Sequence, residues 1–203
     1  MELQESYRVT GPQLEVLGRA ETALPAPARK RPVALGVLVA AALAAVLALG
    51  GLKLKGEYKA VSQLYHSEND GYSIGFLVDQ SQNYAANMIR VASEVLDAQD
   101  PALTGAQEAL EALEQAETPS QEYQAESQLV SRVKELYETA SPLLEGSRYD
   151  SFRGQYQEAL SAWEQSGHMT YNQEAAAYNE TAAAFPANLI AGLWGVQEVE
   201  LYQ

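Results

Sequence analysis

The feature that most restricts the fold is the uncharged segment 33–52, which reads VALGVLVAAALAAVLALGGL. As a helix, a segment of this length rises about 30 Å, the thickness of the hydrocarbon core of a bilayer. A cleaved signal peptide is the alternative, but its apolar core is shorter and lies nearer the start of the chain. It also needs a small-residue cleavage site, for which Gly50-Gly51 is a weak candidate. We therefore predict a transmembrane helix at 33–52.

The charges that flank this segment predict its orientation. Four basic residues lie close before it and three close after it: Arg19, Arg29, Lys30 and Arg31 before, and Lys53, Lys55 and Lys59 after. Because the more basic flank of a membrane helix usually stays in the cytoplasm, we expect the N-terminus inside and the remainder of the chain outside.

Small residues recur every four positions along the same segment, at Gly36, Ala40, Ala44 and Ala48. Such a stripe lets two helices approach closely, so it allows a homo-oligomer through the membrane. An alanine-rich segment also produces this stripe by chance, and both interpretations stay open.

Charge separates the chain into unlike parts. Residues 60–203 carry five Lys and Arg against 22 Asp and Glu, whereas residues 1–32 carry five basic and four acidic side chains. So acidic a domain repels nucleic acid, and we exclude that class of partner. The chain has no cysteine, which excludes disulfides, thiolate catalysis and Cys-based metal sites.

Helical periodicity dominates after the membrane segment and predicts an all-α fold. We expect a juxtamembrane tail with a Pro-rich linker at 1–32, the span at 33–52, and an acidic helical domain at 57–203. The first part of that domain, 57–66, continues the membrane helix up to a turn at 69–71. Short connections between the later helices predict an antiparallel, up-down bundle of about four helices.

Turn and capping residues predict where these helices lie. One helix runs over about 74–98, Asp100-Pro101 starts a second, and Thr118-Pro119 starts a third. On the third helix, a seven-residue repeat with two residues between its members predicts the buried face: Tyr123, Val130, Tyr137 and Leu144, with Val133 and Ala140. Pro142 is expected to kink this helix or end it early and Gly146 to terminate it, before a last helix over about 149–184.

No motif in the chain predicts catalysis, a cofactor or a metal site. The nucleophile elbow, the Walker A loop and the dinucleotide-binding fingerprint are all absent. The two histidines, His66 and His168, lack a second ligand at helical spacing. Glu108, Glu111 and Glu114 are expected on a solvated helix surface rather than as an acid–base pair. We therefore expect a protein that is not an enzyme.

A seven-residue repeat near the C-terminus is the most specific motif. Tyr171-Asn172 recurs as Tyr178-Asn179, and Phe185-Pro186 follows seven residues later. The three rings share one heptad position, so they are expected to line the buried seam of the last helix, whose midpoint Gly167 is a weak point. The two asparagines lie one residue over, where they can hydrogen-bond a neighbouring helix or loop. Candidate residues for an interaction are Tyr171, Asn172, Tyr178, Asn179, Phe185, Pro186, Asn188, Trp194 and Gly195.

The complete pattern, Y-N-x5-Y-N-x5-F-P-x-N-L-I-A-x3-G with a tyrosine near the end, resembles the C-terminal hallmark of the LemA family. Tyr58 is similar to a tyrosine that follows the membrane span in that family, although Lys59 replaces its asparagine. Gly167-His168 stands where the family tends to have Ala-Arg. The resemblance implies a bacterial cytoplasmic-membrane protein with one N-terminal span, a helical bundle and an unsettled biochemical role, and it supplies no catalytic residues.

Two functions fit these features. The first is a non-enzymatic interaction or scaffold module at the cell envelope, with a protein partner at the face that bears Asn172 and Asn179 and at the apolar clasp 185–194. The second is a ligand sensor or envelope enzyme that uses a cleft between helices, with carboxylates and tyrosines as its polar groups.

Overall fold

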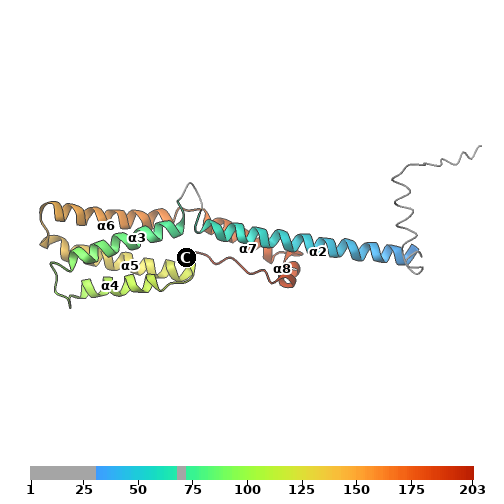
Figure 1. Cartoon of the computed structure of the whole chain (residues 1–203), viewed down its shortest axis with the longest axis horizontal. Coiled ribbons are helices and arrows are strands. Elements are labelled where there is room, and N and C mark those ends of the chain that lie inside the picture. Colours follow the sequence, from blue (N-terminus) through green and yellow to red (C-terminus); the bar gives the residue numbers. More distant parts are fainter. Residues whose placement is uncertain (1–30, 68–71) are drawn as a thin grey trace, which may run out of the picture. The chain divides into compact units, whose positions relative to one another are not determined.

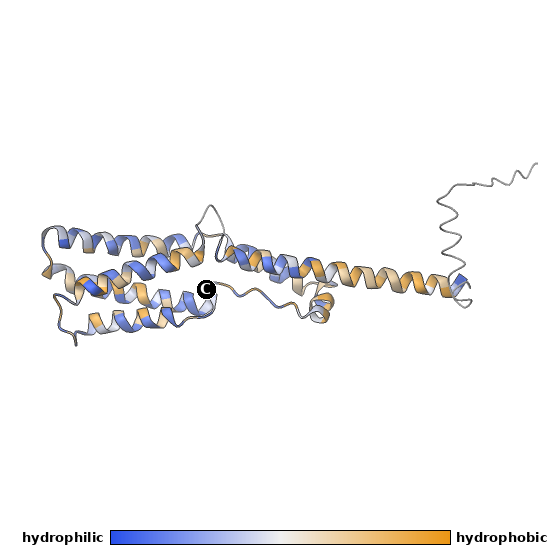
Figure 2. Ribbon diagram, in the orientation of Figure 1, coloured by the Kyte–Doolittle hydropathy of each residue, from blue (hydrophilic) through white to orange (hydrophobic). Residues whose placement is uncertain are grey.

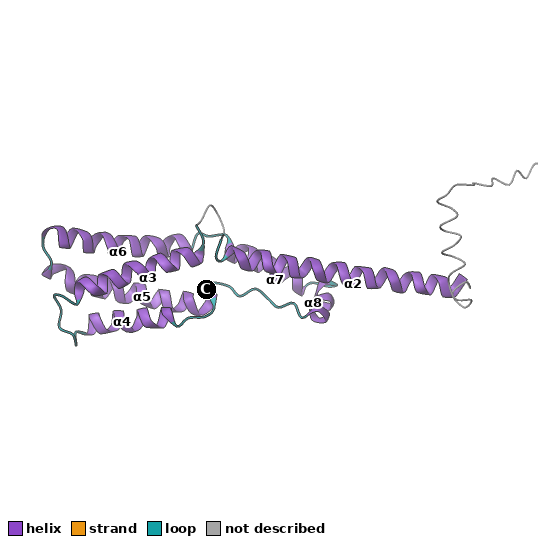
Figure 3. Cartoon of the chain, viewed as in Figure 1, coloured by secondary structure: helices purple, strands orange, loops and turns teal. Residues whose placement is uncertain are grey.

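The computed structural model describes residues 31–67 and 72–203, and these residues form helices and loops without a β-strand (Figure 3). The all-α prediction is confirmed. The predicted tail up to residue 30, with its basic residues Arg19, Arg29 and Lys30, lies outside the described residues, as does the turn expected at 69–71. The chain divides into two compact units, Met1–Gly50 and Gly51–Gln203.

Helix α2 spans Arg31–Leu64 and contains the whole apolar segment. In the described part of the chain it is the one helix long and apolar enough to cross a membrane. Figure 2 shows the continuous hydrophobic colouring of its first half and the mixed colouring of its second half. The helix extends well beyond the span, which confirms the expected continuation through residues 57–64.

A four-helix bundle follows, formed by α3 (Ile74–Ala92), α4 (Pro101–Glu114), α5 (Pro119–Ala140) and α6 (Gly146–Ser166) (Figure 1). Helix α3 packs most extensively on α6, and α4 packs most extensively on α5. Smaller contacts join α3 to α4 and to α5, and α5 to α6. The short connections force consecutive helices to run antiparallel. The up-down bundle is therefore as predicted.

Capping residues define the starts of these helices. Asp100 and Thr118 accept backbone N–H groups of the first turns of α4 and α5, and a proline opens each of the two helices. Ser73 caps α3 in the same way. Each cap satisfies one of the donors that a helix N-terminus leaves free, which confirms the starts predicted at Asp100 and Thr118.

The buried face of α5 agrees with the prediction in part. Val133, Ala140 and Leu144 are buried as expected, whereas Tyr123, Val130 and Tyr137 are only partly buried. The fully buried positions follow steps of three and four residues and are Glu126, Leu129, Val133, Leu136 and Ala140. The seam of this helix therefore includes a carboxylate.

Two predicted helix boundaries are wrong. Helix α3 ends at Ala92 rather than near residue 98. Pro142 ends α5 early, as expected, but Gly146 begins α6 with a φ of 57° instead of terminating the helix before it. The left-handed conformation turns the chain sharply and is one that glycine adopts without a steric penalty.

The last predicted helix is also wrong, since the chain forms two helices in its place. Helix α6 ends at Ser166, a turn follows at 167–170, and α7 spans Tyr171–Ala183. Gly167 was expected to weaken one continuous helix, but it caps the end of α6, where its low helix propensity favours a break. A short helix α8 (Ala187–Trp194) and an extended C-terminal segment (residues 196–203) complete the chain.

Candidate functional site

The repeated Tyr-Asn pairs of α7 place two kinds of side chain on two faces. Consecutive helical residues differ by about 100° in direction, so each tyrosine and the asparagine after it point to different neighbours. Tyr171 and Tyr178 are buried, whereas Asn172 and Asn179 are partly buried beside the C-terminal segment.

The tyrosine face of α7 packs on the C-terminal end of α2. Tyr178 meets Tyr58 edge-on with the ring centroids 6.1 Å apart, and Tyr171 meets Tyr65 edge-on at 5.2 Å. Tyr58 and Tyr65 are also seven residues apart, so two antiparallel heptads bring matching rings together. The tyrosine at 58 thus belongs to the same cluster as the C-terminal motif.

The asparagine face of α7 binds the C-terminal segment through its backbone. Asn172 donates to the carbonyl of Tyr202 at 2.7 Å and accepts its N–H at 2.8 Å. Asn179 makes the same two bonds with Val199, both at 2.8 Å. Each side-chain amide therefore pairs with both the N–H and the carbonyl of one residue, as a neighbouring β-strand would. We name this arrangement the asparagine clamp.

The spacing of the clamp follows from the geometry of its two partners. Seven helical residues rise about 10.5 Å, and three extended residues cover about 10 Å. Asn172 and Asn179 therefore match Tyr202 and Val199 in register, with the two segments antiparallel. The seven-residue spacing of the two asparagines is therefore the spacing that this pairing requires.

Tyr202 carries the C-terminal segment into the bundle core. Tyr202 is 2% exposed, and its ring contacts the ring of Tyr123 with the centroids 5.1 Å apart. Its hydroxyl donates a hydrogen bond to Oε2 of Glu126, which is fully buried on α5. The hydroxyl of Tyr171 adds a bond of 2.5 Å to the carbonyl of Glu200.

Burial controls the protonation of this cluster. It raises the pKa of Glu126, with a smaller contribution from the charge of Glu122, while the hydroxyls of Tyr202 and Ser81 partly oppose the rise. Burial also raises the pKa of Tyr171 to about 12, and the pKa of Tyr202 rises well above its ordinary value for the same reason. The phenols therefore remain hydrogen-bond donors at physiological pH.

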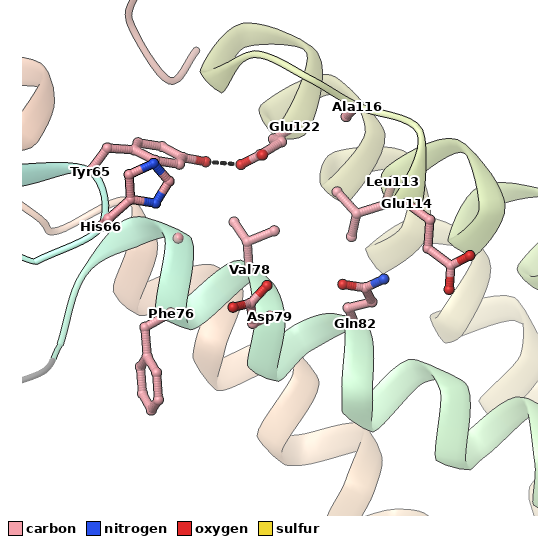
Figure 4. Close-up of a pocket in the computed structure, with 11 residues that line it drawn as sticks. Tyr65, His66, Phe76, Val78, Asp79, Gln82, Leu113, Glu114, Ala116 and Glu122 are labelled. Carbon is pink, nitrogen blue, oxygen red and sulfur yellow. Dashed lines mark hydrogen bonds between the residues drawn. The ribbon is translucent and has the colours of Figure 1, made fainter. Parts of the chain in front are cut away.

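A cleft of about 580 Å³ opens where α2 ends and the bundle begins. Figure 4 shows Tyr65 and His66 on one side, Glu122 opposite them, and Asp79 and Gln82 on α3. Tyr65 donates a hydrogen bond to Oε2 of Glu122. Burial raises the pKa of the Tyr65 phenol, and the hydrogen-bonded carboxylate of Glu122 raises it further. Glu114 on α4 and the apolar Phe76, Val78 and Leu113 complete the principal lining.

A second cleft of about 370 Å³ shares Tyr65, His66 and Glu122 with the first. The C-terminal segment forms one wall of this second cleft through residues 197–200. Six carboxylates line the two clefts together, and no Lys or Arg does: Asp79, Glu114, Glu117, Glu122, Glu198 and Glu200. We call this pair of cavities the acidic cleft.

The structure disperses the remaining residues of the predicted signature. Phe185 is 80% exposed, so its predicted place in the buried seam is wrong. Helix α7 ends at Ala183, which stops the heptad before it reaches Phe185, and Pro186 precedes α8. Asn188 is exposed, and Gly195 ends α8 with a φ of 60°, as the predicted end of the apolar stretch requires.

Trp194 packs against the start of the α2 portion that belongs to the second unit. A Cβ added to Gly51 would overlap the Trp194 ring, and Lys55 Nζ lies 5.4 Å from the ring centroid. Ile190 and Ala191 cover Leu54 beside this contact. One face of α8 is therefore held on α2.

This contact predicts the effect of Gly51→Ala. The methyl group forces Trp194 outward, and we expect a loss of about 1–2 kcal/mol in the docking of α8, since overpacking exceeds the gain in helix propensity. This loss should appear as faster hydrogen exchange at residues 187–195 of the full-length variant than of the wild type. Gly56→Ala is the matched control, because nothing lies within 4 Å of a Cβ there, and exchange in α8 should be unchanged. Equal exchange in both variants would contradict the contact.

Sequence reasoning missed the residues of the acidic cleft and the buried carboxylate. Glu126 had a signal, because it begins a 3-4-3-4 series with Leu129 and Val133 on α5. Tyr65 had one too, seven residues after Tyr58. The cleft carboxylates come from separate helices and had no signal in the sequence. Residues 31–67 and 72–203 contain no group of three potential metal ligands.

Comparison with known proteins bears on the identity of the chain. The model of the LemA family matches residues 72–203, which cover the bundle, the clamp and the C-terminal segment. No curated protein and no solved structure matches the chain. The matched region is more than half of the chain and includes every residue of the Tyr-Asn and Phe-Pro motif. The protein belongs to the LemA family.

Proposed function

We propose that this LemA-family protein is a membrane-anchored, non-enzymatic interaction module that binds a basic segment of a partner protein in the acidic cleft. The observation that carries the proposal is the composition of the cleft, whose described lining has six carboxylates and no Lys or Arg. A row of Lys or Arg side chains complements such a surface. Helix α2 supplies the anchor, and the excess of basic residues before the span favours an acidic domain outside the cytoplasmic membrane.

The asparagine clamp supports a different location for the partner than the motif first indicated. All the hydrogen bonds described for Asn172 and Asn179 go to the backbone of the C-terminal segment. These amides hold one wall of the second cleft in place. They therefore support the binding surface from behind, and a direct contact between them and a partner stays a prediction. Self-association through Gly36, Ala40, Ala44 and Ala48 likewise stays a prediction.

The alternative, a sensor or enzyme with a cleft for a small molecule, has less support. Pockets for small molecules are mostly apolar with a few polar groups, whereas carboxylates dominate the acidic cleft. The carboxylate with the raised pKa, Glu126, is fully buried and paired with Tyr202, so a substrate does not reach it. A binding role uses the carboxylates of the cleft and does not require Glu126 or Tyr202 to react.

Neutralising the cleft tests the proposal. We expect the variant D79N/E114Q/E117Q to bind a fluorescent deca-arginine peptide about tenfold more weakly than the wild type. Each exposed charge pair contributes about 0.5 kcal/mol, so three together approach the 1.4 kcal/mol of one decade. Fluorescence anisotropy on the full chain in nanodiscs measures the affinity.

The control must have the same net charge. E111Q/E138Q/E158Q removes three exposed carboxylates that lie outside the acidic cleft, and its affinity should remain close to that of the wild type. An equal loss in both variants would reduce the effect to net charge and refute a localised site. Cross-linking in native membranes then identifies the partner that the cleft variant loses and the control retains.

A further inference from the structure

Helix α8 is apolar on more than its packed face. It contains no charged residue, and Asn188 is its one strongly polar side chain. Ile190 and Ala191 are buried, but Leu189 and Leu193 are 58% and 71% exposed. These two leucines are four residues apart and share a face of the helix. Phe185, two residues before α8, is 80% exposed as well. We call these three exposed side chains the apolar ridge.

The position of α8 along the chain indicates what covers the ridge. Its partners on α2 are Gly51, Leu54 and Lys55, which lie within three residues of Leu52, the end of the apolar segment. Three helical residues rise about 4.5 Å, so α8 contacts α2 at the level where the predicted span leaves the hydrocarbon core.

The residue types at this contact are those of a membrane interface. Tryptophan and lysine concentrate where hydrocarbon meets headgroups, and Trp194 lies against Lys55 here. Lys53 and Lys59 flank the same turns of α2, whereas the bundle is strongly acidic. Anionic headgroups therefore attract this end of the second unit and repel the remainder.

We propose that α8 is an interfacial helix, whose ridge of Phe185, Leu189 and Leu193 inserts into the lipid bilayer that the span crosses. The inference rests on the membrane anchoring proposed above. A helix with apolar side chains on both faces is stable when it is buried in protein or in lipid, and one face of α8 is already covered by α2. The bilayer covers the other face without a second protein.

The absence of cysteine makes the proposal directly testable. Single cysteines at Leu189, Leu193 and Phe185 carry nitroxide labels in the full chain, reconstituted in vesicles of three parts phosphatidylcholine to one part phosphatidylglycerol. Collisions with oxygen and with a nickel chelate are measured by electron paramagnetic resonance. Labels at the exposed Ser127 and Gln157 of the bundle are the aqueous controls, and Leu43 reports the span.

We expect the ratio of oxygen to nickel accessibility at the three ridge positions to exceed that at Ser127 and Gln157 several-fold. An aqueous ratio at the ridge while Leu43 reports lipid would overturn the interfacial helix and leave the anchor intact. Low accessibility to both reagents at the ridge would indicate a protein contact and also overturn it. An aqueous ratio at Leu43 itself, with loss of vesicle flotation, would refute the anchor.

Discussion

Replacing Asn172 and Asn179 together by alanine is expected to release the C-terminal segment and lower the free energy of unfolding by about 4 kcal/mol. Each asparagine makes two hydrogen bonds to partly buried backbone groups. Leaving such groups unsatisfied costs about 1–3 kcal/mol at each site. Urea unfolding of the full chain in nanodiscs measures the loss. Hydrogen exchange at the amides of Val199 and Tyr202 should accelerate at the same time.

Asn83→Ala is the matched control for the clamp. Asn83 is exposed and donates one bond to the carbonyl of Asp79 in the preceding turn of its own helix. Its loss should change stability by less than about 0.5 kcal/mol. If the double variant unfolds like the control and its C-terminal amides stay protected, the clamp does not hold the segment.

The second large effect concerns Glu126, for which we expect Glu126→Gln to stabilise the protein at neutral pH. Burial raises the pKa of this carboxyl in the folded chain above its ordinary value of about 4.3. The folded state therefore binds the proton more tightly than the unfolded state. The stability from this group is complete below about pH 4.3 and is lost as the pH rises through the folded pKa.

Glutamine imitates the protonated carboxyl at every pH, so the variant lacks this loss. The expected gain at pH 7 is about 1.4 kcal/mol for each unit by which the folded pKa is raised, and it vanishes near pH 4. Urea midpoints of both proteins between pH 4 and pH 8 give the two slopes. Glu138→Gln, an exposed site on the same helix, should retain the slope of the wild type. Parallel curves for E126Q and the wild type would disprove the linkage.

Local chemistry explains which parts of the fold were predictable. Asp100 and Thr118 predict helix starts because the capping side chain and the following proline affect only the first turn of the helix. The Tyr-Asn repeat predicted a buried tyrosine face and asparagines that reach a neighbour, since both follow from helical register. The C-terminal segment as that neighbour was not predictable, because its partner lies thirty residues away for Asn172 and Tyr202.

The errors share a physical cause, which is competition between local preference and tertiary packing. The helical pattern predicts Gly167 as a weak point inside one long helix, but in the structure Gly167 caps the C-terminus of α6. Phe185 follows the heptad numerically, yet the helix has ended before it. Glu126 was not expected inside, although its spacing placed it on the seam. The acidic cleft depends on the ends of four helices, α2, α3, α4 and α5, and on the C-terminal segment, so no single stretch of sequence encodes it.

A segment that is recognised through its backbone leaves most of its own side chains free to vary. Asn172 and Asn179 bind peptide groups, and only Val199 and Tyr202 are buried among residues 196–203. Glu198 is exposed and lines the acidic cleft, whereas the exposed carboxylate of Glu200 also accepts a hydrogen bond of 2.8 Å from the hydroxyl of Thr118. The charge of Glu198 can therefore change through mutation without loosening the attachment. The clamp separates folding from recognition, and related chains can acquire a new partner at this position while keeping the same architecture.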